Sequence, residues 1–289
     1  MDHDKYKGCR KKNSTNPELG AKRIVAIDPN KRDLIFVASE NDAKDGHSDE
    51  TFRYTNQQRK VESGAKLHRK KQWKLAHEHV DGKMVRDHLT ELSKFNHKTV
   101  DLETFLVWLT KKNATNALLF PHYAQWTYRQ MRFRAFQNRK RSEANMINRF
   151  KRKFGGPEDT VVCMGDYSKG GGGYHMKFQE PTLRSGMNTI FRKAGYQVLL
   201  VDEHRTSKCC FNCKHVDSNC KKFLTVENPR SYQRDKYPTV IRHGLVKCTI
   251  CDTLWNRDRN ASLNILYLAQ QAFQGKSRPK YLSRETKKE

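Results

Sequence analysis

Three apolar runs of strand length, each ending on an acidic residue, restrict the fold of this chain more than any other feature. They are "RIVAID" (23–28), "TVVCMGD" (160–166) and "YQVLLVDE" (196–203). Short apolar runs rich in β-branched residues are typical of buried strands. A further run, "DLIFVA" (33–38), follows the first after the turn "PNKR", which predicts a hairpin over residues 23–38. With helices predicted around 182–194 and from about residue 258, the chain is expected to have an α/β fold with a mixed sheet.

Helical spacing and positive charge characterise the segment from about residue 57 to 153, for example in "DLETFLVWL". It is predicted to be a basic helical insertion in the sheet domain. Its last helix is expected to pack Phe133, Phe136 and Phe150 on one side and to leave its cations for nucleic-acid phosphates. The candidate phosphate-binding residues are Arg129, Arg132, Arg134, Arg139, Lys140, Arg141, Arg149, Lys151, Arg152 and Lys153.

Acidic residues recur at the ends of the central elements. Asp28, Asp166 and the pair Asp202 and Glu203 end predicted strands, and Asp258 opens a predicted helix. Each has a structural explanation as a turn residue, a strand end or a helix N-cap. Their recurrence nevertheless favours a shared site at one edge of the sheet. Clustered carboxylates repel one another unless cations neutralise them, and two Mg²⁺ ions about 4 Å apart can hydrolyse a phosphodiester.

Two C-x-x-C pairs, "CFNC" and "CTIC", indicate one structural zinc site. The ligands they supply are Cys210, Cys213, Cys248 and Cys251. Four thiolates complete a tetrahedral shell without an open position for water, so this zinc is expected to build structure. The 34 residues between the pairs predict an insertion that loops out. Cys209 and Cys220 are alternative ligands, and free thiols or a redox pair are the alternative to metal binding.

An excess of basic residues indicates a polyanionic partner. Lysine and arginine number 57 against 31 acidic residues, a net charge of +26, which opposes compaction unless nucleic acid neutralises part of it. The first residues, "MDHDKYKGCRKKN", lack the apolar core of a secretory signal, and the longest apolar runs are too short to cross a membrane. The protein is therefore expected to be intracellular and not associated with membranes.

Three stretches together resemble the signatures of the transposon-encoded TnpB nucleases and of the Fanzor proteins, their eukaryotic and giant-virus relatives. They are "AIDPNKRDLIFVA", "VDEHRTSKCCFNC" and "CTICDTLWNRDRNASLNIL", and they span roughly residues 23–270. The resemblance implies a RuvC-like nuclease domain of the RNase H fold, with a zinc-ribbon insertion before the final catalytic helix. It also implies a guide RNA, a DNA substrate, and a nuclear location if the host is eukaryotic or viral.

The resemblance also implies site residues. By position, the first catalytic aspartate is Asp28 and the last is Asp258. TnpB has a glutamate at the strand end that Asp166 occupies here, whereas Fanzor proteins carry an alternative glutamate just before "TS", at Glu203. In an RNase H sheet the strand ending at Asp166 lies beside that of Asp28, and the strand ending at Glu203 lies one further out. Because the longer glutamate side chain can span that gap, Glu203 is preferred as the middle acid, with Asp166 as the alternative middle acid or as a supporting or additional metal ligand. Asp202 is expected on the other face of the sheet.

The function implied is a Mg²⁺-dependent endodeoxyribonuclease in which Asp28, Glu203 and Asp258 hold the magnesium ions. The segments expected are a flexible basic arm (1–22), the first part of the nuclease core (23–203) containing the insertion at 57–153, the zinc-binding insertion (204–256), the final nuclease helix (257–274) and a basic tail (275–289). Only 22 residues precede the first strand, where family members usually carry guide-binding and target-recognition domains. Two alternatives therefore stay open: a non-catalytic zinc-ribbon nucleic-acid-binding remnant of a mobile element, and a guide-independent RuvC-type resolvase or transposase.

Overall fold

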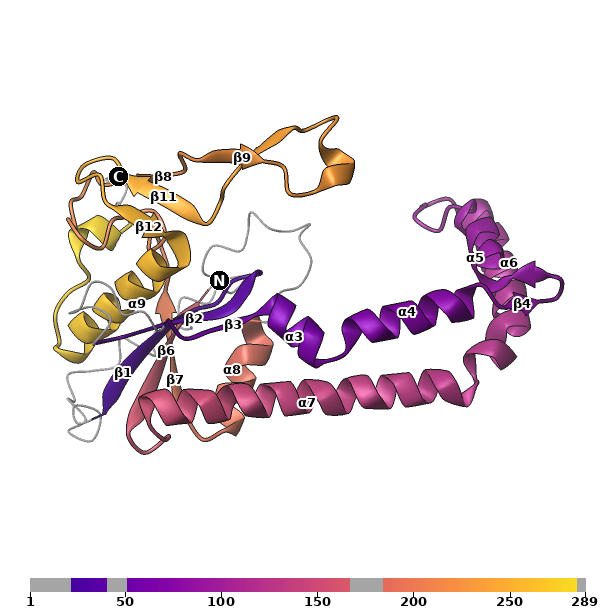
Figure 1. Ribbon diagram of the computed structural model, residues 1–289, viewed down its shortest axis with the longest axis horizontal. Helices are drawn as coiled ribbons and strands as arrows, with labels where there is room; N and C mark the ends of the chain where they lie inside the picture. The colour runs from indigo at the N-terminus through magenta and orange to yellow at the C-terminus, as the bar shows by residue number, and fades with distance from the viewer. Residues whose placement is uncertain (1–21, 41–50, 167–183, 285–289) are drawn as a thin grey trace. The chain divides into compact units, whose positions relative to one another are not determined.

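The computed structural model describes residues 22–40, 51–166 and 184–284, and the arm expected before residue 22 lies outside this part of the chain. The chain divides into two compact units (Figure 1). The sheet unit comprises Met1–Asn56 and Met146–Glu289, and the helical unit comprises Gln57–Asn145. Within the described residues, no helix is long and apolar enough to cross a membrane.

A five-stranded mixed sheet forms the centre of the sheet unit, with the order β3-β2-β1-β6-β7. The strands are β1 (Arg23–Asp28), β2 (Asp33–Ser39), β3 (Arg53–Thr55), β6 (Thr160–Asp166) and β7 (Gln197–Asp202). The first three pair antiparallel, whereas β6 is parallel to both β1 and β7. The predicted hairpin and mixed α/β architecture are confirmed. The strand of Asp166 lies beside that of Asp28, and β7 lies one further out, as expected.

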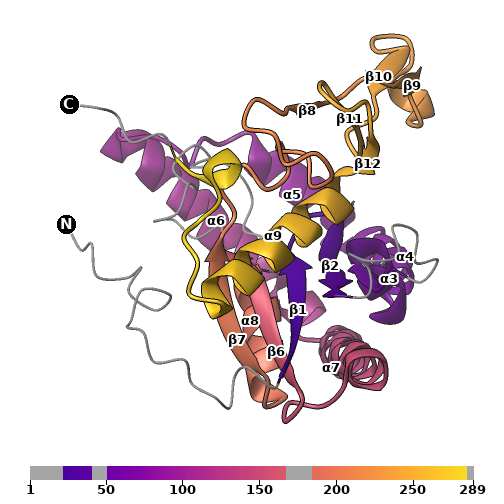
Figure 2. The same cartoon turned by 90° about the vertical axis from the view of Figure 1, so that its left-hand side faces the viewer.

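Helices cover both faces of the sheet. On one face, the end of α7 (Trp126–Phe154) and α8 (Arg184–Lys193) pack against Val25, Ile27 and Met164. Phe150 of α7 is fully buried there and makes edge-on ring contacts with neighbouring aromatic residues. On the other face, α9 (Arg257–Phe273) lies along the strands (Figure 2), with Ile265 among the residues packed against β1 and β6. Strand alternation therefore assigns each strand residue to an α7/α8 face or to an α9 face.

The helical unit contains α3 (Asn56–Glu62), α4 (Ala65–Ala76), the short strands β4 (His79–Val80) and β5 (Lys83–Met84), α5 (Val85–Ser93), α6 (Leu102–Tyr123) and most of α7. A salt bridge of 3.0 Å between Arg59 and Glu143 joins α3 to α7, and the Ser142 hydroxyl donates to the Glu62 carboxylate. The expected packing of three aromatic residues along the last helix is wrong for two of them. Phe133 and Phe136 are exposed, because the buried stripe of α7 runs instead through Met131, Ser142 and Met146.

The cysteine region adds short strands to the sheet unit. These are β8 (Cys220–Lys221), β9 (Thr225–Glu227), β10 (Thr239–Ile241), β11 (Leu245–Cys248) and β12 (Leu254–Asn256), with the 3₁₀ turn η3 (Ser231–Gln233) between β9 and β10. The excursion expected between the cysteine pairs is the antiparallel pair β9–β10. Part of the expected basic tail is also structured: η4 (Lys280–Leu282) buries Tyr281 and Leu282 against Cys209 and Leu268.

Candidate active site and metal centre

Asp28 and Asp258 lie together at the ends of β1 and α9. Asn30, in the turn after β1, brings them together, because its side-chain nitrogen donates to Asp28 Oδ2 at 2.6 Å and to Asp258 Oδ1 at 3.0 Å. Asp258 is not the N-cap of its helix. Asn256 takes that role by accepting from the backbone amides of Asp258 and Arg259, which leaves the Asp258 carboxylate available to the site.

Glu203 reaches the same face of the sheet from β7. Its carboxylate lies over Gly165, since a Cβ added at Gly165 would meet Glu203 Oε2 at 2.8 Å and Ile265 of α9 at 3.2 Å. The β1–β6 register ends with Ile27 opposite Met164, so Asp28 and Gly165 are next in line. The space beside Asp28 that a side chain at position 165 would fill is therefore taken by the Glu203 carboxylate.

Asp166 and Asp202 point to the opposite face. On β6, Val162 and Met164 belong to the α7/α8 core, and alternation places Asp166 with them. Asp166 and Asp202 are directly opposite in the β6–β7 register. Asp202 pairs with the C-terminal cations Arg278 at 3.8 Å and Arg284 at 3.2 Å. These two acids consequently do not share a face with Asp28, Glu203 and Asp258.

A further acid, Asp33 at the start of β2, lies near Asp258 and was missed from the sequence. It is 6% exposed, and its Oδ1 atom is buried without a hydrogen-bond partner. Burial and then the negative charge of the neighbouring Asp33 carboxylate raise the pKa of Asp258, while Arg257 and Arg32 oppose the shift. Nothing in the hairpin pattern distinguishes Asp33 from an ordinary turn acid, so no local signal could have identified it.

The oxygen ligands of the acids are of the kind that hard cations such as Mg²⁺ prefer. Among the described residues, only the four cysteines form a group of three or more potential metal ligands with all atoms within 4.8 Å of one another. By this criterion the described carboxylates do not form one compact ligand set. Mg²⁺ prefers oxygen ligands with few carboxylates per ion. The unpartnered Asp33 Oδ1 is an acceptor that a cation would satisfy.

Cys210, Cys213, Cys248 and Cys251 form the second candidate metal site. The sulfur atoms of Cys210 and Cys251 are 3.6 Å apart, and those of Cys213 and Cys248 are 3.8 Å apart. A tetrahedral zinc ion with Zn–S bonds of about 2.3 Å requires sulfurs roughly 3.8 Å apart. The predicted pairing of the two C-x-x-C motifs into one site is what the structure shows, and the four thiols are arranged to hold a metal such as zinc.

Burial raises the pKa of the Cys210 thiol and raises that of Cys213 to about 12, and hydrogen bonds to the sulfurs oppose this effect. The Trp255 indole donates to Cys210 Sγ at 3.2 Å and the Ile250 amide to Cys248 Sγ at 3.4 Å. Burial opposes ionisation of Cys251, but hydrogen bonds from Thr253, Cys210 and Cys248 together outweigh it and lower the pKa of this thiol to about 6. Of the two alternative ligands, Cys209 donates to the Tyr281 carbonyl and lies outside the cluster. Cys220 pairs with Cys248 across β8 and β11 and is also outside it.

Two buried asparagines of α9 tie the chain that leaves Glu203 to the helix that carries Asp258. The side-chain amides of Asn260 and Asn264 each donate to the carbonyls of Thr206 and Cys209, at 2.8–3.2 Å. Thr206 in turn donates from its amide and hydroxyl to the Glu203 carbonyl. Thr206 of the "TS" motif and the two asparagines of "NASLN" therefore hold the backbone that positions Glu203 relative to Asp258.

The candidate phosphate-binding residues lie along α7. Lys153 is half-buried and the other nine are exposed, as phosphate contact requires. Arg149, Lys151, Arg152 and Lys153 belong to the sheet unit, whereas the remaining six lie on the part of α7 in the helical unit.

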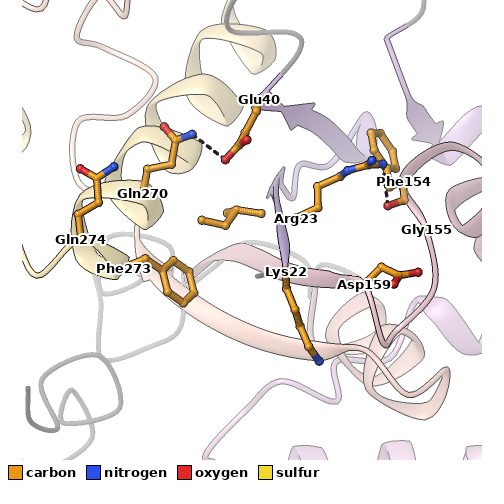
Figure 3. Close-up of a pocket in the computed structure, with 10 residues that line it drawn as sticks. Lys22, Arg23, Glu40, Phe154, Gly155, Asp159, Gln270, Phe273 and Gln274 are labelled. Atoms are coloured by element: carbon orange, nitrogen blue, oxygen red, sulfur yellow. Dashed lines mark hydrogen bonds between the residues drawn. The ribbon is translucent and has the colours of Figure 1, made fainter. Parts of the chain in front are cut away.

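A pocket of about 730 Å³ lies at the start of β1, at the other end of this strand from Asp28. Figure 3 shows Lys22, Arg23, Glu40, Asp159 and Gln270 around it. Some of its polar groups pair with one another or with the backbone, since Gln270 donates to Glu40 at 3.2 Å and Arg23 to the Phe154 carbonyl at 3.0 Å. The pocket contains none of the predicted site residues.

Comparison with known proteins identifies the cysteine region. Residues 183–265 match the family model described as Cas12f1-like, TNB domain, a segment that includes Glu203, the four clustered cysteines and Asp258. A comparison with curated protein sequences finds no match.

Solved structures similar to this chain include a Cas12f1–sgRNA–target DNA complex, with 14% identity and a TM-score of 0.37 over 84% of this chain and 49% of that chain. CasPhi-2 (Cas12j) bound to crRNA and phosphorothioate-DNA gives 14% identity and a TM-score of 0.48, over 92% and 48%. CasPhi-2 bound to crRNA gives 14% identity and a TM-score of 0.41, over 89% and 48%. The chain spans about half the length of these proteins.

Proposed function

We propose that this chain is a RuvC-like, Mg²⁺-dependent endodeoxyribonuclease of the Fanzor/TnpB type, guided by RNA. The observation that carries the proposal is the gathering of Asp28, Glu203 and Asp258 on the α9 face of the sheet. A nucleic-acid-binding module has no need of three acids on one face, because carboxylates repel both one another and phosphate.

Glu203 is the middle acid in this proposal. Its carboxylate lies over Gly165, beside the position of Asp28, whereas Asp166 is on the face covered by α7 and α8. The β6 position next in line with Asp28 is Gly165, which has no side chain, and the longer Glu203 side chain occupies the space over it.

The residues of the site have distinct tasks. Asp28, Glu203 and Asp258 hold the cations, and Asn30 fixes the spacing of the two aspartates through its shared amide. Bound Mg²⁺ would activate a water molecule and stabilise the leaving oxygen of the phosphodiester. The four-cysteine site supports this arrangement from outside, because zinc would anchor the segment that Asn260 and Asn264 bind.

The nucleic-acid partners are a DNA substrate and a guide RNA. Support comes from the motif resemblance, from the Cas12f1-like match over residues 183–265 and from the exposed cations of α7. Those cations suit the phosphates of a guide–target duplex, which proteins of this kind bind through its backbone and shape. We place the protein inside the cell, and in the nucleus where the host is eukaryotic or viral.

The decisive experiment combines sequencing of the co-purified RNA with a Mg²⁺-dependent cleavage assay. The DNA library carries the sequence matching the bound RNA next to randomised flanks. Asp28→Asn, Glu203→Gln and Asp258→Asn are expected to reduce cleavage by about 10³-fold or more, whereas the matched control Asp166→Asn retains it. Zinc content and thermal unfolding establish that each variant is folded.

The outcomes separate the candidate functions. Cleavage that persists in both Asp28→Asn and Asp258→Asn would remove the active-site assignment. Loss of cleavage in Asp166→Asn together with full activity in Glu203→Gln would reverse the choice of middle acid. Heterogeneous bound RNA without cleavage supports the non-catalytic binder. Cleavage of branched or single-stranded DNA without RNA supports the guide-independent nuclease.

A further inference from the structure

Asp33 reaches the acidic site because β2 contains a bulge. Its pairing with β3 shifts between Asp33 and Ile35, so that Leu34 and Ile35 both pack into the core on the α7/α8 face. In regular alternation Asp33 would share the face of Ile35 and Val37. The additional residue turns Asp33 to the α9 face, where its carboxylate lies close enough to Asp258 for the two negative charges to repel each other. Bulges next to active sites commonly redirect a side chain in this way.

The surroundings of Asp33 lack a donor for one of its oxygens. Asp33 is 6% exposed, its Oδ1 atom has no partner, and Asp258 of α9, on which its charge acts, is another acid. Buried polar atoms without partners are rare, and each requires an explanation such as an ion. Arg32 and Arg257 are close enough to act on Asp258 electrostatically, yet neither satisfies Asp33 Oδ1.

We propose that Asp33 is a fourth carboxylate ligand of the magnesium site, sharing with Asp258 a cation that satisfies its buried Oδ1 atom. This inference rests on the proposed function and adds a residue to its site. A cation between Asp33 and Asp258 removes their repulsion and supplies the missing partner. It also explains why the chain has a buried acid beside the one that opens α9.

Manganese binding tests the proposal without measuring activity. Zinc-loaded full-length protein is titrated with Mn²⁺ while the signal of free Mn²⁺ is followed by electron paramagnetic resonance, and thermal unfolding is recorded with and without Mn²⁺. The variants are Asp33→Asn, Asp28→Asn and the control Asp166→Asn. Asp33→Asn should weaken at least one Mn²⁺ site by about tenfold or more. It should also unfold at a higher temperature than wild type without Mn²⁺, and gain less stability when Mn²⁺ is added.

A higher unfolding temperature without Mn²⁺ combined with a smaller gain on adding Mn²⁺ identifies Asp33 as a metal ligand. If Asp33 had only a structural role, its replacement would lower the unfolding temperature both with and without Mn²⁺. If Asp33→Asn does not fold, Asp33→Ser provides the same comparison, and Asp33→Glu should restore part of the Mn²⁺ affinity. Wild-type binding in Asp33→Asn together with loss in Asp28→Asn overturns this inference and leaves the proposed function standing. If the wild-type protein binds no Mn²⁺, both are overturned.

Discussion

Gly165→Ala is expected to impair cleavage while leaving the fold intact. The added Cβ would lie 2.8 Å from Glu203 Oε2 and 3.2 Å from Ile265 Cδ1. Because carbon and oxygen rarely approach closer than about 3.3 Å, the carboxylate must move by roughly half an ångström or more. The clash is with the end of a flexible side chain, so the free energy of unfolding should fall by no more than about 1 kcal/mol.

The effect on catalysis should be larger. A displacement of about 1 Å in an active site costs on the order of 100-fold in rate, so half that distance predicts a loss of about tenfold, or ~1.4 kcal/mol in the activation barrier. The assay is single-turnover cleavage in Mg²⁺, with urea unfolding of the same preparations. Gly186→Ala is the matched control, because a Cβ at Gly186 meets nothing within 4 Å.

A double variant locates the effect. In the Glu203→Gln background, Gly165→Ala should cause little further loss, because the group it displaces is already disabled. Full activity of Gly165→Ala, or an equal additional loss in the Glu203→Gln background, would refute the assignment of Glu203 to the space over Gly165.

Three further predictions concern the zinc site, the core and the cations of α7. Cys213→Ser or Cys251→Ser should reduce the zinc content from about one ion per chain to none in metal analysis, whereas the control Cys220→Ser should retain the zinc. Loss of zinc on replacing Cys220 instead would contradict the four-cysteine assignment. Phe150→Ala should lower the free energy of unfolding by about 3–5 kcal/mol in urea denaturation, because Phe150 is fully buried. Phe136 on the same helix is exposed, so Phe136→Ala should change the free energy of unfolding by less than ~0.5 kcal/mol. Arg134→Ala and Arg141→Ala should each reduce the slope of log binding constant against log salt concentration by about one for an RNA–DNA duplex, measured by fluorescence anisotropy. An unchanged slope would exclude phosphate contact. The control Lys83→Ala removes a cation that already pairs with Glu91 at 2.8 Å.

Local patterns in the sequence were sufficient for much of the architecture. The strands at 23–28 and 160–166 and the helix from Arg257 follow from runs of apolar residues whose spacing is a property of each segment alone. The two C-x-x-C pairs likewise predicted a single cluster, because a shared tetrahedral site needs two such pairs. Helical spacing was less reliable for the aromatic residues of α7. It could not determine which side of a long helix would find a partner, and Phe133 and Phe136 are exposed.

The sequence by itself determined which residue types lie at the ends of the strands and helices. Tertiary structure decided which of them meet, because the face that a strand residue occupies depends on register and bulges set by its partner strands. Register placed Asp166 on the face away from Asp28 and left Gly165 beneath the Glu203 carboxylate. The β2 bulge turned Asp33, an inconspicuous hairpin residue, toward Asp258.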